Sequence, residues 1–221
     1  MAKIRKLSVF HIGIYIVIFF LVWSIRELII RPVFLDSLNE IMFQVMESSM
    51  KLLVWTLPAV LFIRYFQGEM WISLKEMFTN KPKWFKDAPM LALVIIIPFL
   101  QAWMSFGKIT IHQDFVPIKL IETVLFVGIS EEMVFRGFLL NAMLKKMKLM
   151  PAILINAALF LFIHYPFWIY QGHNISMFIS SSFTVLLLGA LFAYSFVKTK
   201  NILIPIALHM KWNLLLAIFY G

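Results

Sequence analysis

Seven apolar stretches constrain the fold of this chain more than any other feature of its sequence. A helix that crosses a bilayer needs roughly 20 mostly apolar residues, and each stretch reaches or approaches that length. Hydrophobic residues make up 62% of the 221 residues and charged residues 14%, which is too little polar side chain to cover a soluble globule. We therefore predict an all-α fold, a polytopic transmembrane helix bundle of about seven spans. The predicted spans are 8–30, 48–66, 88–107, 118–144, 151–170, 176–197 and 201–220.

The connections between these spans are short, except for one polar segment at 67–87. Apolar side chains alternate there with Lys and Glu, which is typical of an amphipathic helix lying on the membrane surface. A solvated loop is the alternative. No linker or internal repeat divides the chain, so we predict one integral membrane domain. Its N-terminal part is 1–117, which includes the segment near 67–87, and its C-terminal part is 118–221.

Lysines and arginines gather in short clusters between the apolar stretches, as membrane-surface anchors do. One set of alternate connections holds 13 of them and the other set holds five. The positive-inside rule then places the N-terminus in the cytoplasm, and we predict a multi-pass protein of the cell membrane. The basic residues that give the net charge of +9 are thus expected to contact the lipid bilayer, which is the predicted partner. No nucleic acid is expected. The five residues on the other side are Arg26, Arg31, Lys51, Lys108 and Lys119.

The basic N-terminal tail and the first apolar stretch also fit the start of a signal peptide. The stretch is longer than the apolar part of a signal peptide, and no small-x-small cleavage site follows it before Arg26. We therefore predict a retained helix. The chain contains no cysteine, which excludes disulfides, a thiol nucleophile and a metal site with Cys ligands.

Three of the predicted spans carry polar side chains near their middle. Glu131, Glu132 and Arg136 stand in the fourth span, and ionisable groups at membrane depth are costly unless they face a protein interior or a water-filled cavity. His164 in the fifth span and His209 in the seventh lie at a similar depth, judged from a rise of about 1.5 Å per residue. Three helices would therefore deliver acid and imidazole groups to one buried site. The fifth and seventh spans also contain Asn156, Lys211 and Asn213.

Helical spacing indicates how these residues divide their roles. Glu132 and Arg136 are four residues apart and can form an ion pair along one helix face, whereas Glu131 is rotated away from Arg136. Glu131 is thus left without an adjacent cation on its own helix, in a dry environment that suits a general base. His209 and Asn213 share a face, and both can donate hydrogen bonds to charge that develops on a peptide carbonyl. The structural alternative is that they tie neighbouring helices together.

Three motifs follow one another on separate apolar helices. They are Glu131-Glu132-x-x-x-Arg136, Phe160-x-x-x-His164 and His209-x-x-x-Asn213. In this order they resemble the motifs of the CPBP family of intramembrane proteases, the CAAX-protease and bacteriocin-processing group that is also called abortive-infection-type. The resemblance covers about 118–220, so that 118–221 would be a catalytic helical core of the CPBP type.

The resemblance implies a role for each motif residue. Glu131 would activate a water for attack on a peptide bond, and His164 would assist it. His209 and Asn213 would stabilise the oxyanion. The supporting residues would be Glu132, Arg136 and Phe160.

Two chemistries fit such a site. The resemblance implies a metal-free, glutamate-type mechanism, which is the current view of the family's prenyl protease. A zinc ion held by Glu131, His164 and His209 is the alternative, because an acid and two imidazoles can leave an open position for water. We predict no cofactor, because a His and an Asn one turn apart suit an oxyanion clamp better than a ligand pair. The sequence also lacks the H-E-x-x-H helix of zinc proteases.

The sequence thus predicts an intramembrane endopeptidase that hydrolyses a peptide bond in a hydrophobic or membrane-associated peptide or protein. The alternatives are a non-catalytic bacteriocin-immunity or membrane partner protein of the same fold, and a small ion- or proton-coupled transporter. The complete set of acid, histidines and asparagine disfavours the first, and the lack of repeated halves disfavours the second. We further expect a cavity around Glu131 that opens to the cytoplasm beside the basic 67–87 and 145–148 connections.

Overall fold

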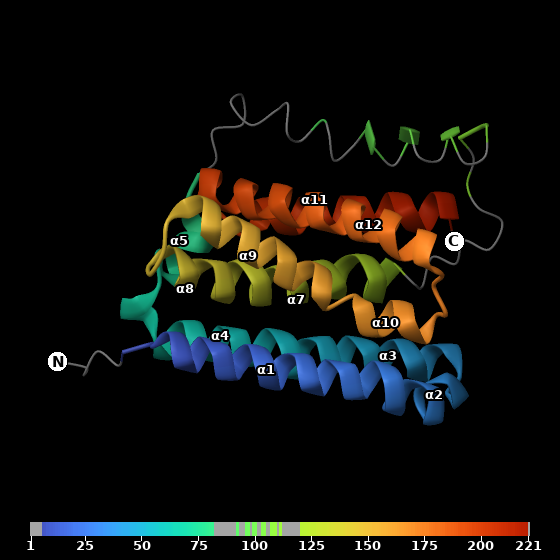
Figure 1. Ribbon diagram of the computed structural model, residues 1–221, viewed down its shortest axis with the longest axis horizontal. Helices are drawn as coiled ribbons and strands as arrows, with labels where there is room; N and C mark the ends of the chain where they lie inside the picture. Colours follow the sequence, from blue (N-terminus) through green and yellow to red (C-terminus); the bar gives the residue numbers. More distant parts are fainter. Residues whose placement is uncertain are drawn as a thin grey trace.

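The computed structural model describes residues 6–81 and 120–220, and a few short groups of residues between 92 and 111. All regular structure in these residues is helical, and the long helices run side by side along the long axis of the molecule (Figure 1). The predicted all-α transmembrane bundle is confirmed. The third predicted span, 88–107, falls largely outside the described residues.

Four helical segments in the described part of the chain are long and apolar enough to cross a membrane. They are Val9–Ser37, Glu40–Tyr65, Leu149–Tyr170 and Ile175–Thr199, at the places of the first, second, fifth and sixth predicted spans. A shorter apolar helix, α12, occupies the seventh. The elements in chain order are α1 (Val9–Ile25), a π-helical stretch (Arg26–Ile30), α2 (Arg31–Val33), a 3₁₀ turn (Leu35–Ser37), α3 (Glu40–Met50), a π-helical stretch (Lys51–Thr56), α4 (Leu57–Tyr65), a 3₁₀ turn (Gln67–Glu69), α5 (Leu74–Thr79), a π-helical stretch (Ile121–Phe126), α7 (Val127–Glu132), a π-helical stretch (Met133–Leu140), α8 (Asn141–Leu144), α9 (Leu149–Phe162), α10 (Tyr165–Tyr170), α11 (Ile175–Thr199) and α12 (Leu203–Tyr220).

The second span begins at Glu40, well before the predicted start at residue 48. Asn39 caps this helix, because its side chain accepts a hydrogen bond from the backbone N–H of Met42. The early turns are not apolar enough for hydropathy to reveal them, since Glu40, Gln44 and Glu47 recur there at helical spacing. Polar residues on one face of a membrane helix indicate that this face borders protein or water.

Residues 121–144 form one continuous helix, called the central helix below, which corresponds to the fourth predicted span. It is built from α7, α8 and two π-helical stretches, and π-helical turns are frequent at functional sites. Every residue from 130 to 143 is buried. Neighbouring helices therefore enclose this segment on all sides, and its acidic residues face protein or a cavity rather than lipid.

The fifth span is interrupted between α9 and α10, at Ile163 and His164. Pro166 lies in the first turn of α10 and has no N–H with which to continue the hydrogen-bond ladder of α9. The backbone N–H of His164 instead bonds to the carbonyl of Leu161 over 3.0 Å. The interruption places His164 between two helices rather than within one regular helix.

The described basic connections meet at one end of the molecule, called the basic end below (Figure 1). Lys146 Nζ lies 2.8 Å from Glu69 Oε2, and Asn80 Nδ2 donates to the backbone carbonyl of Lys200 over 3.0 Å. The segment after α4 therefore contacts both the end of the central helix and the end of α11. This gathering on one side agrees with the predicted alternation of connections.

Part of the predicted 67–87 segment forms the short helix α5, which a capping box between Ser73 and Glu76 begins. The side chain of Met77 is fully buried, and the Met77 carbonyl accepts a hydrogen bond from the N–H of Ile202 over 2.8 Å. The helix thus packs on the bundle through the side of Met77, and residues 82–87 of the predicted segment lie outside the described residues.

Aromatic rings fill the half of the bundle nearest the basic end. The ring centroids of Tyr15 and Phe138 are 4.8 Å apart, and those of Phe19 and Trp55 are 4.7 Å apart. Such edge-to-face contacts stabilise a core beyond simple burial. We call this group the aromatic cluster; its members are Tyr15, Phe19, Trp55, Phe62, Phe135 and Phe138.

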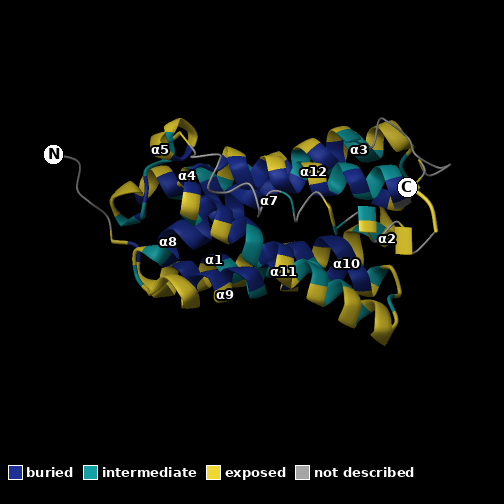
Figure 2. Cartoon of the chain, turned by 90° about the horizontal axis from the view of Figure 1, so that it is seen from above, coloured by how far each residue is buried: buried dark blue, intermediate teal, exposed yellow. Residues whose placement is uncertain are grey.

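The outer faces of the long helices carry exposed apolar side chains, whereas the interior is buried (Figure 2). On α1 these include Val17, Ile18 and Leu21, each more than half exposed. A contiguous apolar surface of this kind is costly in water and matches a lipid environment. It supports the assignment of a multi-pass membrane protein.

Candidate active site

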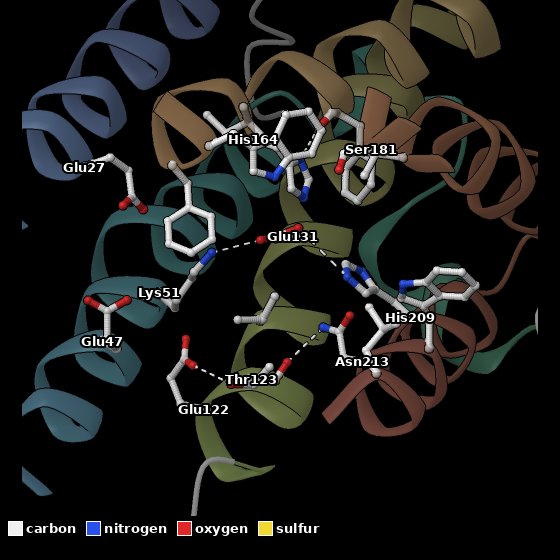
Figure 3. A pocket seen from close by; sticks show the side chains of 18 of the residues that line it. Glu27, Glu47, Lys51, Glu122, Thr123, Glu131, His164, Ser181, His209 and Asn213 are labelled. Carbon is white, nitrogen blue, oxygen red and sulfur yellow. Dashed lines mark hydrogen bonds and ion pairs between the residues drawn. The ribbon is translucent and has the colours of Figure 1, made fainter. Parts of the chain in front are cut away.

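A cavity of about 940 Å³ lies between the helices, and all four predicted catalytic residues line it (Figure 3). Glu131 comes from the central helix, His164 from the α9–α10 break, and His209 and Asn213 from α12. Phe160 also lines the cavity. Glu132 and Arg136 do not, so they stand behind its wall. The three motifs are therefore brought together.

Glu131 is paired with a lysine that the sequence analysis did not assign to the site. Lys51 Nζ, on the second span, lies 2.9 Å from Glu131 Oε1, and the two side chains are 5% and 7% exposed. The Lys51 ammonium also lies 3.8 Å from the centroid of a Trp55 ring and 4.6 Å from that of Trp23, at cation–π distance. Glu131 has no paired cation on its own helix, as expected, but it has one from another helix.

The count of basic residues needs a correction at two positions. Lys51 and Arg26 were placed at a membrane surface, but their side chains are almost fully buried. Arg26 pairs with Glu27 and Glu47 inside the bundle. Removing these two from the less basic side increases the asymmetry on which the predicted orientation depends.

One signal in the sequence could have indicated Lys51. Glu40, Gln44, Glu47 and Lys51 follow one another at spacings of four, three and four residues, which places them on one helix face. All four line the cavity. This polar stripe begins before the apolar part of the second span, and in the sequence it indicates a helix face that lines a cavity.

Glu132 forms the predicted ion pair with Arg136. Arg136 Nη1 lies 2.9 Å from Glu132 Oε1, and neither side chain is exposed. Arg136 Nη2 donates to the carbonyl of Gly189 on α11 over 2.8 Å, and its guanidinium lies over the Phe160 ring at 4.3 Å. The pair therefore links the central helix to α9 and α11.

Glu132 has a second partner, which the sequence analysis missed. His209 Nδ1 lies 2.9 Å from Glu132 Oε1, so the Nδ1–H of the imidazole donates to this carboxylate. The opposite nitrogen, Nε2, is then directed to the cavity side and lies 4.0 Å from Glu131 Oε2. Glu132 thus fixes the ring that stands between the two acids.

His164 and Asn213 are each anchored to backbone. His164 Nδ1 lies 2.8 Å from the carbonyl of Phe160 and donates to it, so Nε2 is the nitrogen that remains for chemistry. Figure 3 shows the His164 ring beside Glu131. Asn213 Nδ2 donates to the carbonyl of Thr123 over 2.8 Å, and the amide group has a second hydrogen.

The cavity extends away from the basic end, contrary to the expectation. On the second span it is lined by residues between Glu40 and Trp55, and on α12 by residues between His209 and Leu216. Both sets extend from the middle of their helix toward the end that is remote from the basic end. Among the residues described in 67–81 and 145–148, none lines it. The bundle interior on the basic side is filled by the aromatic cluster instead.

The zinc alternative requires Glu131, His164 and His209 to act together as ligands. In the described part of the chain, no three His, Asp or Glu side chains are grouped as metal ligands. Glu131 Oε1 is engaged by the Lys51 ammonium, and His209 Nδ1 by Glu132. These contacts leave Glu131 Oε2 and His209 Nε2 on the cavity side, 4.0 Å apart.

Comparison with protein families identifies the C-terminal part of the chain. Residues 113–215 match the family model described as type II CAAX prenyl endopeptidase Rce1-like. The match includes every residue of the three motifs and confirms the predicted resemblance. It covers somewhat less than half of the chain and leaves Lys51 outside. No match is found among curated proteins or solved structures.

Proposed function

We propose that this protein is an intramembrane endopeptidase in which Glu131 activates the attacking water. The observation that carries the proposal is the meeting of Glu131, His164 and His209 on one cavity at the middle of the bundle. The family match to prenyl endopeptidases supports the same class of reaction. The proposed substrate is a hydrophobic or membrane-associated peptide, because the cavity lies among helices whose outer faces match a lipid environment.

In the first step, a water between Glu131 and the peptide gives a proton to Glu131 Oε2. Its oxygen forms a bond to the peptide carbonyl carbon, and the carbonyl becomes a tetrahedral oxyanion. His164 Nε2 accepts the other O–H of the water and orients it. General-base catalysis of this kind contributes about 10²–10⁴-fold to a rate.

In the second step, the negative charge on the oxyanion needs hydrogen-bond donors. Asn213 supplies its second amide hydrogen, and His209 supplies Nε2–H in its doubly protonated form, since Nδ1–H already donates to Glu132. Glu131 then returns its proton to the peptide nitrogen. The C–N bond breaks, and a carboxylic acid and an amine leave as products.

The reaction is proposed to proceed without a metal. The Lys51 ammonium occupies one oxygen of Glu131 and leaves Oε2 to accept the proton of the water. Metal analysis of purified active protein tests this proposal. A full equivalent of zinc that is lost together with activity in the variants His164→Ala and His209→Ala would overturn it.

Peptide cleavage is measured with purified protein in lipid nanodiscs. Two quenched fluorescent peptides serve as substrates, one with a farnesylated CAAX end and one without the farnesyl group. We expect cleavage of at least one, and a loss of about 10²–10⁴-fold in Glu131→Gln. Glu69→Gln, the same change outside the cavity, serves as the control.

If neither peptide is cut, new peptide N-termini are compared between membranes of cells that express the wild type and the Glu131→Gln variant. Identical termini, together with two uncut peptides, would refute the proposal. Equal activity of the wild type and Glu131→Gln at matched amounts of folded protein would refute it as well.

Access to the site is proposed from the side opposite the basic end. If the basic end is cytoplasmic, as the positive-inside rule predicts, the cavity faces the outer side. Because the chain has no cysteine, a single Ser181→Cys change on the cavity lining can report this. A membrane-impermeant thiol reagent should label it from outside intact cells. Labelling only in inverted vesicles would reverse the orientation.

A further inference from the structure

We propose that Lys51 is a positioning residue of the reaction: it holds one oxygen of Glu131 and thereby presents the other to the attacking water. The inference rests on the proposed function of Glu131. It assigns a part of the active site to the N-terminal half of the chain, outside the segment that matches the endopeptidase family.

The geometry separates the two oxygens of the carboxylate. Oε1 accepts from Lys51 Nζ at 2.9 Å, whereas Oε2 has no hydrogen-bond partner in the described part of the protein. Oε2 is directed toward His209 Nε2 at 4.0 Å (Figure 3). A carboxylate held by one oxygen cannot rotate freely, so the free oxygen stays on the side of the histidine.

Lys51 itself is held in place by aromatic rings. Its ammonium lies over Trp55 and Trp23, and its side chain is 5% exposed. Trp55 belongs to the aromatic cluster, so the lysine is fixed by the packed core of the N-terminal helices. A catalytic base positioned by a packed second residue keeps its geometry during the reaction.

The charge balance of the site also favours this role. Glu132 is neutralised by Arg136, which leaves Glu122 and Glu131 as the buried carboxylates of the central helix that line the cavity. Lys51 donates a hydrogen bond to Glu131 at 2.9 Å, whereas His209 Nε2 lies 4.0 Å from the other oxygen. A buried carboxylate without such a partner carries a large desolvation cost.

The first test is Lys51→Met, which keeps an unbranched side chain one atom shorter than that of lysine and removes its charge. Displacement of the base lowers the rate of the chemical step by about 10²-fold. We therefore expect kcat to fall by about that factor with KM nearly unchanged. Lys146→Met is the matched control, because it removes a similar lysine–glutamate contact of 2.8 Å at the basic end. Unchanged kcat in Lys51→Met would overturn the proposal.

A second test covers the case in which Lys51→Met does not fold. Lys51→Cys introduces the only thiol of the chain. Alkylation with 2-bromoethylamine restores an ammonium at the length of lysine, whereas 1-bromopropane gives a neutral side chain of the same length. Intact mass confirms complete modification before each assay. Activity should return with the aminoethyl group alone; equal activity of the two adducts would contradict a role of the charge.

The two proposals fail in different ways. Full activity of Glu131→Gln would remove the proposed function and with it the role of Lys51. An inactive Glu131→Gln protein together with a fully active Lys51→Met protein would remove only the inference about Lys51.

Discussion

The two adjacent acids of the central helix face different regions, a cavity and a closed wall. Glu131 faces the cavity and pairs with Lys51 from another span. Glu132 faces the wall and pairs with Arg136 one turn further along the same helix, with no exposed surface on either side chain. Residues next to each other on a helix point about 100° apart, so one step along the chain changes the surroundings of a carboxylate completely.

The difference shows how a membrane protein can use buried charge in two ways. On the wall side, Glu132 contacts both Arg136 of its own helix and His209 of α12, and Arg136 also bonds to Gly189 of α11. These contacts hold three helices together. On the cavity side, the ion pair of Lys51 with Glu131 leaves Oε2 of the carboxylate without a partner and facing the cavity. The wall pair is expected to determine stability, and the cavity pair to determine turnover.

The largest effect is expected from Arg136→Met, which breaks the wall pair. It leaves Glu132 buried without its guanidinium, and breaking a buried ion pair costs about 3–5 kcal/mol. Unfolding monitored during SDS titration should show this loss. The double variant Glu132→Gln with Arg136→Met removes both charges and should recover part of it. A stable single variant would contradict the assignment of Arg136 to the wall.

The next effect concerns the cavity side. Asn213→Ala should lower kcat by about 10²–10³-fold, because it removes a donor to the oxyanion. Asn156→Ala is the matched control: Asn156 donates to the carbonyl of Phe135 over 2.7 Å, much as Asn213 does to that of Thr123, but does not line the cavity. Equal losses of kcat in the two folded variants would show that both amides are only structural.

A smaller effect is expected where α9 and α11 cross beside the wall. A Cβ atom at Gly189 would lie 3.2 Å from Ala157 Cα and 3.2 Å from Phe160 Cδ1. Gly189→Ala should therefore destabilise the protein by about 1–3 kcal/mol, measured by the same titration. Gly13→Ala on α1 meets nothing within 4 Å and should be neutral or stabilising. A stabilising Gly189→Ala would show that the helices have room to separate.

The smallest effect belongs to the Glu69–Lys146 pair, which lies outside both regions. The hydrogen bond from Lys146 lowers the pKa of Glu69 below its ordinary value of 4.5. A carboxyl group whose pKa is lowered by folding stabilises the folded state above that value, and the contribution is lost as the pH falls through the lowered pKa. The wild type should therefore be slightly more stable than Glu69→Gln at pH 7 and lose this advantage in acid. A difference that persists at low pH would contradict an ionic origin.

The sequence predicted those features of the fold and site that depend on local spacing. Apolar length located the first, second, fifth and sixth spans, and a four-residue spacing predicted the contact of Glu132 with Arg136. The four predicted catalytic residues and Phe160 line one cavity, whereas Glu132 and Arg136 stand behind its wall. Their catalytic roles remain predictions, since no measurement of activity bears on them.

The sequence analysis missed the contacts that join distant parts of the chain. Lys51 lies 80 residues from Glu131, and no periodicity in either segment connects them. Hydropathy also misplaced the start of the second span, because the turns that line the cavity are polar. The bond from His209 to Glu132 was missed for the same reason, since it depends on how α12 packs against the central helix.

The aromatic cluster has a consequence for the membrane as a barrier. A wet cavity that reaches the middle of a bilayer shortens the insulating layer, and an open continuation would let protons and ions leak down the membrane potential. Tyr15, Phe19 and Phe138 are buried in the half of the bundle between this cavity and the basic end. Packed apolar rings exclude water, as hydrophobic constrictions do in channels. The core that stabilises the helices thus also keeps the membrane electrically sealed around a site that needs water.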